Sequence, residues 1–227
     1  GDMQRQTLLL YFYSLFFGSL LTEKPIACFI GAQYSGKSFL AQAIGKLMIG
    51  PAYNATNIPS DKHSLAILMN STHYLVIDNA DSKLEKGLSD VTDAAATGVE
   101  YEGRKYYSDH EKTTIPMNCF MVFTSREGEF IRDASKASRL LMFHTERLQA
   151  VADKNALLRP LFENRNAILS EVVWNLQSVL KLLAAREKRR VAFEIYRKEH
   201  NPAARDPEDY AVFRIASWEV FVNQLCS

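Results

Sequence analysis

An eight-residue segment near the start of the chain combines the residue types that bind phosphate. Residues 31–38 read GAQYSGKS, with a glycine at each of two positions and Lys37 and Ser38 at the end. Glycines let the backbone approach an anion closely, and amide groups at the start of a helix point toward phosphate oxygens. In this spacing the lysine reaches the terminal phosphates and the serine ligates Mg²⁺. The segment predicts a site for ATP and Mg²⁺ with contacts from Gly31, Ala32, Gln33, Tyr34, Ser35, Gly36, Lys37, Ser38 and Phe39.

The residues on both sides of this phosphate loop agree with that prediction. The apolar run 26–30 precedes it, as a buried strand would, and apolar residues from Phe39 to Met48 follow it at helical spacing. The alternative is a glycine turn followed by a solvated lysine, which this strand–loop–helix context disfavours.

A carboxylate closes a second strand-like run. Residues 73–79 read HYLVIDN, and the run is apolar up to Asp78, which is typical of a parallel strand covered on both faces. An acid at the carboxyl end of such a strand lies beside the phosphate loop of a doubly wound sheet, where it can hold Mg²⁺ and its water. Ser38 and Asp78 are therefore the predicted metal-site residues, although an Asp there can also cap the following turn. Asn79 comes next, and its amide can orient a water molecule but cannot take its proton.

Polar residues also follow the third strand-like run. Residues 119–123 are apolar and end in Thr124 and Ser125, which are positioned to touch the γ-phosphate or the attacking water. The segment 126–139 is rich in arginine and precedes a fourth apolar run, 140–143. An arginine that faces a neighbouring subunit's nucleotide can stabilise the charge on the transferred phosphoryl group. Arg139 and Arg132 are the candidates, with an ion pair to a surface acid as the alternative for each.

The segment 97–108, TGVEYEGRKYYS, suggests a β-hairpin around Glu102 and Gly103. Its far limb would carry Arg104 and Lys105 beside two tyrosines. Cations beside aromatic rings suit a single-stranded nucleic acid, because phosphate attraction and base stacking both act without sequence preference. A solvated hairpin with its tyrosines packed inward fits the same residues equally well.

Strands and helices that alternate along the chain indicate an α/β fold. We expect a three-layer P-loop NTPase core over residues 1–150, with a parallel central sheet, and a helical lid or C-terminal subdomain over residues 151–227. The apolar segment 8–21 is expected to be a core helix, because it is about a third shorter than the roughly 20 residues that span a membrane. Ser60 and Asp61 are expected to cap a helix that ends near Met69.

The C-terminal region has its own pattern. Apolar residues at three-to-four-residue spacing from Ile168 to Leu183 predict a long amphipathic helix that packs as a lid or against the sheet. The segment 181–198 is basic and is interpreted as a solvated helix face, with a DNA-facing surface as the alternative. A last helix is expected over residues 213–225.

Composition limits the class of protein. A chain of 227 residues with 47% apolar residues can bury a full core. The 27 Lys and Arg balance 26 Asp and Glu, so any surface for nucleic acid must be a local patch. Three widely separated cysteines indicate reduced thiols in a cytoplasmic protein. The five histidines have no paired metal-ligand spacing.

The order of these features resembles the superfamily 3 helicases, which belong to the AAA+ group and include the ATPase halves of viral, phage and plasmid primase-helicases. The resemblance covers roughly residues 8–180 and rests on the phosphate loop, Asp78–Asn79, Thr97–Gly98 before Arg104–Tyr107, Thr124–Ser125, and Ser138–Phe143. It implies a homo-oligomeric, hexameric ring in which the hairpin grips single-stranded or forked DNA. It also implies that Arg139 completes a neighbour's ATP site.

The resemblance implies an ATP-dependent DNA motor, a helicase or translocase that acts in the replication of a phage or mobile element. The chain departs from the family pattern at Asn79, where a second acid is common, and at Thr124–Ser125, where the family has an asparagine. Gly98–Val99 stands where the family has a pair of glycines. Asn79 favours an alternative function, an ATP-binding assembly switch that hydrolyses little and recruits DNA or protein partners.

Overall fold

Within the described part of the chain, four parallel strands form the central sheet. The computed structural model describes residues 2–56, 58–83, 86–104, 112–128, 137–149 and 153–200. The strands are β1 (Ile26–Ile30), β2 (Tyr74–Ile77), β5 (Phe120–Ser125) and β6 (Leu140–His144), in the order β2-β5-β1-β6. Every pairing between them is parallel, so their carboxyl ends meet at one edge. The predicted α/β class with a parallel sheet is confirmed.

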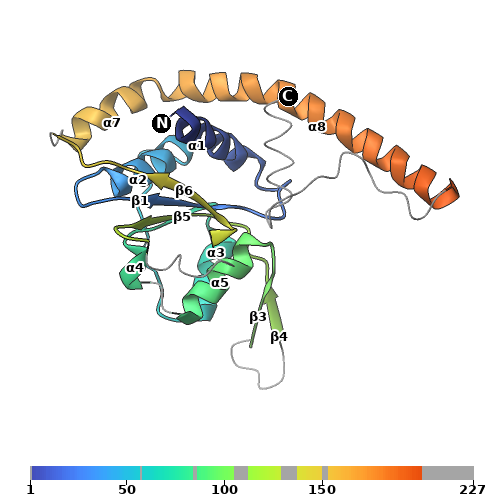
Figure 1. The fold of residues 1–227 in the computed structure, drawn as a ribbon, viewed down its shortest axis with the longest axis horizontal. Helices are drawn as coiled ribbons and strands as arrows, with labels where there is room; N and C mark the ends of the chain where they lie inside the picture. Colours follow the sequence, from blue (N-terminus) through green and yellow to red (C-terminus); the bar gives the residue numbers. More distant parts are fainter. Residues whose placement is uncertain are drawn as a thin grey trace.

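Helices cover both faces of this sheet (Figure 1). Helices α1, α2, α7 and α8 lie on one side of it, and α3, α4 and α5 lie on the other. The helical elements are α1 (Asp2–Ser14), the 3-10 helix η1 (Leu15–Phe17), α2 (Lys37–Met48), α3 (Lys62–Ser71), α4 (Ala80–Lys83), α5 (Lys86–Ala96), α7 (Lys154–Glu163) and α8 (Arg165–His200).

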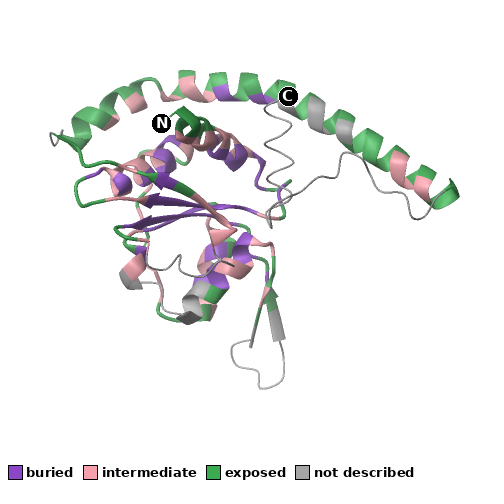
Figure 2. Cartoon of the chain, in the orientation of Figure 1, coloured by how far each residue is buried: buried purple, intermediate pink, exposed green. Residues whose placement is uncertain are grey.

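Alternate residues of each buried strand pack into two separate cores. On β1, Ala27 and Phe29 belong to the core under α1 and α2, and Ile26 and Cys28 belong to the core over α3 and α5. This alternation is the consequence of the two-residue period of a strand. Because both faces are covered, β2 and β5 are buried along their whole length, and β1 is buried except at Ile30 (Figure 2). The three-layer arrangement follows directly from the uninterrupted apolar runs in the sequence.

The first apolar segment is a core helix, as predicted. Helix α1 begins at Asp2, earlier than expected, and continues through η1 to Phe17. Tyr11 and Leu15 are fully buried, and the Tyr11 hydroxyl donates to the Met121 carbonyl at 3.1 Å. Among the described residues, no helix is both long enough and apolar enough to cross a membrane.

The predicted cap of α3 is confirmed, and the structure describes two of the three cysteines. Asp61 caps α3, because its carboxylate accepts a hydrogen bond from the Ser64 amide at 2.8 Å. The cysteines that the structure describes, Cys28 and Cys119, are free and buried. Burial raises the pKa of each thiol to about 12, so both stay protonated.

The predicted hairpin exists, but its turn was placed wrongly. Strand β3 (Tyr101–Arg104) pairs antiparallel with β4 (Lys112–Ile115), and Glu102 and Gly103 pair with Thr114 and Thr113 inside this ladder. Both residues are paired within the two strands, so the chain does not turn there. Arg104 therefore ends the first strand, and Lys105 lies outside the described residues. The hairpin extends from the side of the molecule that carries α3 and α5 (Figure 1).

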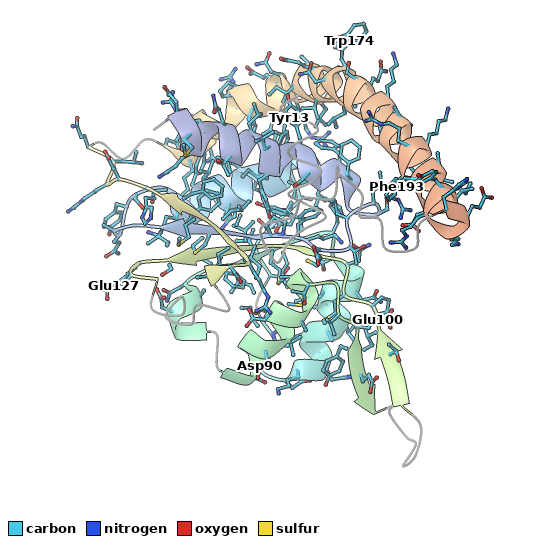
Figure 3. All side chains as sticks on the ribbon, turned by 45° about the vertical axis from the view of Figure 1, so that its right-hand side comes forward. Tyr13, Asp90, Glu100, Glu127, Trp174 and Phe193 are labelled. Atoms are coloured by element: carbon cyan, nitrogen blue, oxygen red, sulfur yellow. The ribbon has the colours of Figure 1, made fainter. Side chains whose placement is uncertain are left out.

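Helix α8 is much longer than the sequence predicted. It spans 36 residues, about 54 Å at 1.5 Å per residue. Its first half packs through Val172 and Leu176 onto the core that contains α1 and α2. Trp174, 74% exposed, points away from the body (Figure 3). The helix beyond Leu180 continues away from the core (Figure 2), as expected for a solvated face.

Two parts of the C-terminal prediction remain predictions. The helix expected over residues 213–225 lies outside the described residues. The domain boundary near residue 150 is not tested, although α8 shares a core with α1 and α2.

The packing of α8 predicts unequal effects for two leucines on the same helix. Leu176 is 5% exposed and Leu180 is 47% exposed. Leu176→Ala should lower the free energy of unfolding by about 2–4 kcal/mol, because it removes buried apolar surface and leaves a cavity. Leu180→Ala should cost less than about 1 kcal/mol. Urea denaturation of both variants measures the difference, and equal losses would contradict this packing of the helix.

Candidate functional site

The phosphate loop joins β1 to α2, and its two glycines are required for different reasons. A Cβ atom on Gly31 would lie 2.2 Å from the Thr145 carbonyl oxygen, because the residues after β6 pass directly against the loop. Gly36 caps α2 with φ of +80°, a backbone conformation that favours glycine. The loop therefore has the close approach and the left-handed turn that a phosphate cradle needs.

Lys37 points into the hollow of this loop. Its ammonium group donates to the carbonyls of Gly31 and Ala32 at 2.6 and 2.7 Å, and it lies 3.2 Å from the Ser35 hydroxyl. The side chain is buried, and burial lowers its pKa; the charge of Arg126 lowers it further, while Asp78 acts in the opposite direction. A cation held at the hollow of the loop by carbonyls and a hydroxyl is placed to meet phosphate oxygens.

The predicted metal residues are brought together. The Ser38 hydroxyl donates to Asp78 Oδ1 at 2.6 Å, and the Thr124 hydroxyl donates to the same oxygen at 2.5 Å. The backbone N–H of Asn79 in turn donates to Thr124 Oγ1 at 2.9 Å. One carboxylate beside one serine hydroxyl fits Mg²⁺, which binds through few protein oxygens and keeps several waters. The described residues hold no group of three or more His, Cys, Asp or Glu side chains that would suit a different metal.

Strand order explains why these residues meet. Strand β5 lies between β1 and β2. Ile77 pairs with Phe123, which puts Asp78 level with Thr124, and Ile30 pairs with Ser125, which puts Gly31 level with Arg126. The end of β5 therefore fills the space between the phosphate loop and the carboxylate.

Ser125 has a partner that the sequence did not reveal. Its hydroxyl donates to Asp81 Oδ2 at 2.6 Å, and the Arg126 amide donates to the same oxygen at 3.0 Å. The Gly128 amide donates to Ser125 Oγ at 2.6 Å. The only sequence signal for Asp81 was an acid three residues after Asp78, at the start of the short helix α4.

A cavity of about 420 Å³ lies between the phosphate loop and the ends of β2 and β5. Its walls are the loop and helix residues 33–39, the strand-end residues 78–79 and 124–126, and three residues beyond β6, which are Leu148, Lys154 and Leu157. The Leu148 amide donates to the Tyr34 carbonyl at 3.2 Å, which attaches this last segment to the phosphate loop.

Arg126 and the three residues beyond β6 were not predicted to belong to the site. Gly31 and Ala32 were predicted as contacts and lie at the loop's start, where they accept from Lys37.

Arg139 lies at the other end of the sheet. It precedes β6, and its carbonyl accepts a hydrogen bond from the Ile26 amide at the start of β1. Its guanidinium is 3.9 Å from Asp93 on α5, and the two side chains are 14% and 18% exposed. The structure therefore does not bring Arg139 to the cavity of its own chain, and its action on a neighbour's nucleotide stays a prediction. Arg132 lies outside the described residues.

The described part of the predicted DNA-binding hairpin also lies away from this cavity (Figure 1). Arg104 ends strand β3 of the hairpin, whose strands contact α3, and none of the described residues that line the cavity belongs to β3 or β4. The role of Arg104 and Lys105 in binding DNA stays a prediction.

A parallel sheet, a phosphate loop between its β1 and the following helix, and an aspartate at the end of another strand define a P-loop NTPase fold. No family model and no curated protein matches the chain.

Solved structures that are similar to the chain include helicases. A structure described as SCCmec type IV Cch, an active helicase, is 14% identical with a TM-score of 0.43, over 97% of this chain and 44% of that one. JCV helicase is 16% identical with a TM-score of 0.39, over 97% of this chain and 54% of that one. The chain thus spans about half the length of these proteins.

The two loop glycines yield a prediction about stability. Gly31→Ala should lower the free energy of unfolding by about 2–4 kcal/mol, because its Cβ would meet backbone atoms of Thr145 that cannot move aside. Gly36→Ala should cost only about 1–2 kcal/mol, since its Cβ would make an ordinary van der Waals contact, 3.7 Å from Leu148 Cδ1, and the cost comes from the positive φ. Denaturation curves compare the two, and the reverse order would contradict this account of the loop.

Proposed function

We propose that the protein is an ATPase that drives movement along DNA, a helicase-like or translocase-like motor. The observation that carries the proposal is the convergence of the Ser38 and Thr124 hydroxyls on Asp78, within 2.6 Å, beside a lysine held in a phosphate loop. This set of groups has the donors and the carboxylate that a nucleoside triphosphate and Mg²⁺ require.

Each residue of the cavity has a proposed role. Lys37 offsets the negative charge of the terminal phosphates. Ser38 and Asp78 hold Mg²⁺, which supplies positive charge to the phosphate oxygens when it is bound. Thr124 and Ser125 line the cavity and sense the γ-phosphate indirectly, since their hydroxyls donate to Asp78 and Asp81 and so link the end of β5 to these carboxylates. Asn79 orients the attacking water.

Asn79 is the observation that favours a second candidate function. Its backbone has φ of +58°, and its backbone N–H donates a hydrogen bond to Thr124 Oγ1, so the residue has a fixed place at the cavity. A carboxamide cannot accept the proton of the water that attacks, so hydrolysis would be slow without another base. The alternative is an assembly switch that binds ATP, hydrolyses little and recruits DNA or protein partners.

DNA binding and assembly are proposed from the resemblance in the order of the motifs. We propose a homo-oligomeric ring, hexameric by family likeness, in which Arg104 and Lys105 on the hairpin contact single-stranded or forked DNA. Arg139 would then act on the nucleotide of the adjacent subunit after it leaves Asp93. The proposed setting is the replication of a phage or mobile element.

Hydrolysis of ATP, measured with and without single-stranded DNA, tests the proposal. A motor should accelerate on DNA, whereas a switch should bind ATP and stay at a basal rate. Lys37→Ala should lower turnover on the order of 100-fold or more, because it removes the cation at the phosphates. Lys62→Ala is the control, since Lys62 is exposed at the start of α3 on the other face of the sheet. Unchanged turnover and ATP affinity in Lys37→Ala would remove the phosphate loop from the function.

The hairpin has a test of its own. Replacement of both Arg104 and Lys105 by Ala should weaken binding to single-stranded DNA and reduce the slope of log K against log salt, by about 0.7 for each phosphate that is no longer neutralised. Affinity for ATP should not change, because the hairpin lies away from the cavity. Glu100→Gln is the control, as it alters an exposed charge at the base of the same hairpin. DNA-binding curves that stay unchanged would leave the hairpin with a structural role only.

A further inference from the structure

The cavity contains a second cation that the proposed roles do not use. Arg126 follows Ser125 directly at the carboxyl end of β5 and lines the same cavity as Lys37. The register of β5 puts Arg126 level with Gly31, the first residue of the phosphate loop. Two cations that face one cavity repel each other, and the charge of Arg126 is one cause of the lowered pKa of Lys37. An anion between them would relieve that repulsion.

The backbone on both sides of Arg126 is fixed by hydrogen bonds. Asp81 Oδ2 accepts from the Arg126 amide at 3.0 Å and from the Ser125 hydroxyl at 2.6 Å, and Ser125 Oγ accepts from the Gly128 amide at 2.6 Å. Asp81 therefore holds the backbone from which the guanidinium extends. A side chain on a fixed backbone contacts a ligand with a smaller loss of conformational entropy.

The hydroxyls of Thr124 and Ser125 are already hydrogen-bonded to carboxylates, so a donor to phosphate is more readily supplied by the next residue. Thr124 donates to Asp78 and Ser125 donates to Asp81, so both hydroxyls at the end of β5 have carboxylate partners. The next residue in the strand direction is Arg126. A guanidinium presents a planar array of donors that matches phosphate oxygens and stays charged at every physiological pH.

We propose that Arg126 contacts the γ-phosphate of the nucleotide bound to its own subunit, and that Asp81 is the residue that positions it. The inference rests on the proposed nucleotide site and names the group that would distinguish ATP from ADP there. It differs from the role proposed for Arg139, which lies at the opposite end of the sheet and would act on a neighbouring subunit.

Affinities for ADP and for a non-hydrolysable ATP analogue test this contact. Arg126→Ala should weaken binding of the ATP analogue by about 10- to 100-fold, the range of a charge-assisted hydrogen bond, and should leave ADP affinity within about threefold. Arg126→Lys should keep part of the difference, because it keeps the charge but not the planar donors. Arg5→Ala is the control, since Arg5 is an exposed arginine on α1.

The positioning role of Asp81 is tested by the ratio of the affinity for the ATP analogue to the affinity for ADP. Asp81→Asn should reduce the preference for the ATP analogue over ADP by about three- to tenfold, and the midpoint of urea unfolding is measured in parallel. A lower unfolding midpoint with an unchanged ratio would make Asp81 purely structural. That result would overturn its positioning role.

Mixtures of two variants decide whether the contact lies within one subunit. Subunits with Arg126→Ala keep their phosphate loop, and subunits with Lys37→Ala keep Arg126. If Arg126 serves its own subunit, mixing the two variants restores no tight site for the ATP analogue. Restored tight binding would show that Arg126 reaches a neighbour and would overturn the inference as stated.

The same measurements separate this inference from the proposed function. If the wild-type protein binds neither nucleotide, or if Lys37→Ala binds both normally, the nucleotide site and the Arg126 contact fall together. If Lys37→Ala loses binding while Arg126→Ala keeps the wild-type ratio of affinities, the site stands and the Arg126 contact is wrong.

Discussion

Strand β5 lies between the phosphate loop and Asp78, and the contacts that join different strand ends depend on this strand order. Neighbouring strands lie about 4.8 Å apart, so the ends of β1 and β2 are about 10 Å apart with β5 between them. Ser38 lies in the first turn of α2 and Thr124 lies at the end of β5, and the hydroxyls of both residues donate to the same oxygen of Asp78. Without the strand order, two residues that are 40 positions apart in sequence would have no reason to share a hydrogen bond.

Charge at this edge of the sheet is unequally distributed. Three cations line the cavity, namely Lys37, Arg126 and Lys154. Among the described lining residues, Asp78 is the single carboxylate. A partly buried cation is costly unless an opposite charge or hydrogen bonds compensate for it. Lys37 obtains part of this compensation from the loop carbonyls. A polyphosphate, with several negative charges in a row, would complete it, which is why an anionic ligand suits this cavity better than a neutral one.

The sequence predicted the parts of the site that depend on local backbone geometry. Gly31 and Gly36 are recognisable because a close approach and a positive φ both require glycine, and Asp78 is recognisable because it ends an apolar strand. Asp81 and Arg126 were missed because their contact joins segments 45 residues apart, and no spacing in the sequence records it. The hairpin turn was misplaced for a related reason. Glu102–Gly103 has the composition of a turn, but strand pairing sets the register, and the ladder continues through both residues.

The helices after β6 complete the cavity as well as the core. Helix α7 supplies Lys154 and Leu157 to the cavity walls. The first residue of α8, Arg165, donates to the carbonyls of Leu47 and Met48 at 2.8 and 3.0 Å, where α2 ends. Those carbonyls have no partner within α2 itself, so the guanidinium both satisfies them and complements the negative end of the helix dipole. Helix α2 is thus fixed at both ends, by the phosphate loop at Lys37 and by α8 at Met48. Any displacement of the loop when an anion binds must therefore either strain α2 or move the start of α8 with it, because a helix of 12 residues transmits a shift along its axis as a rigid body.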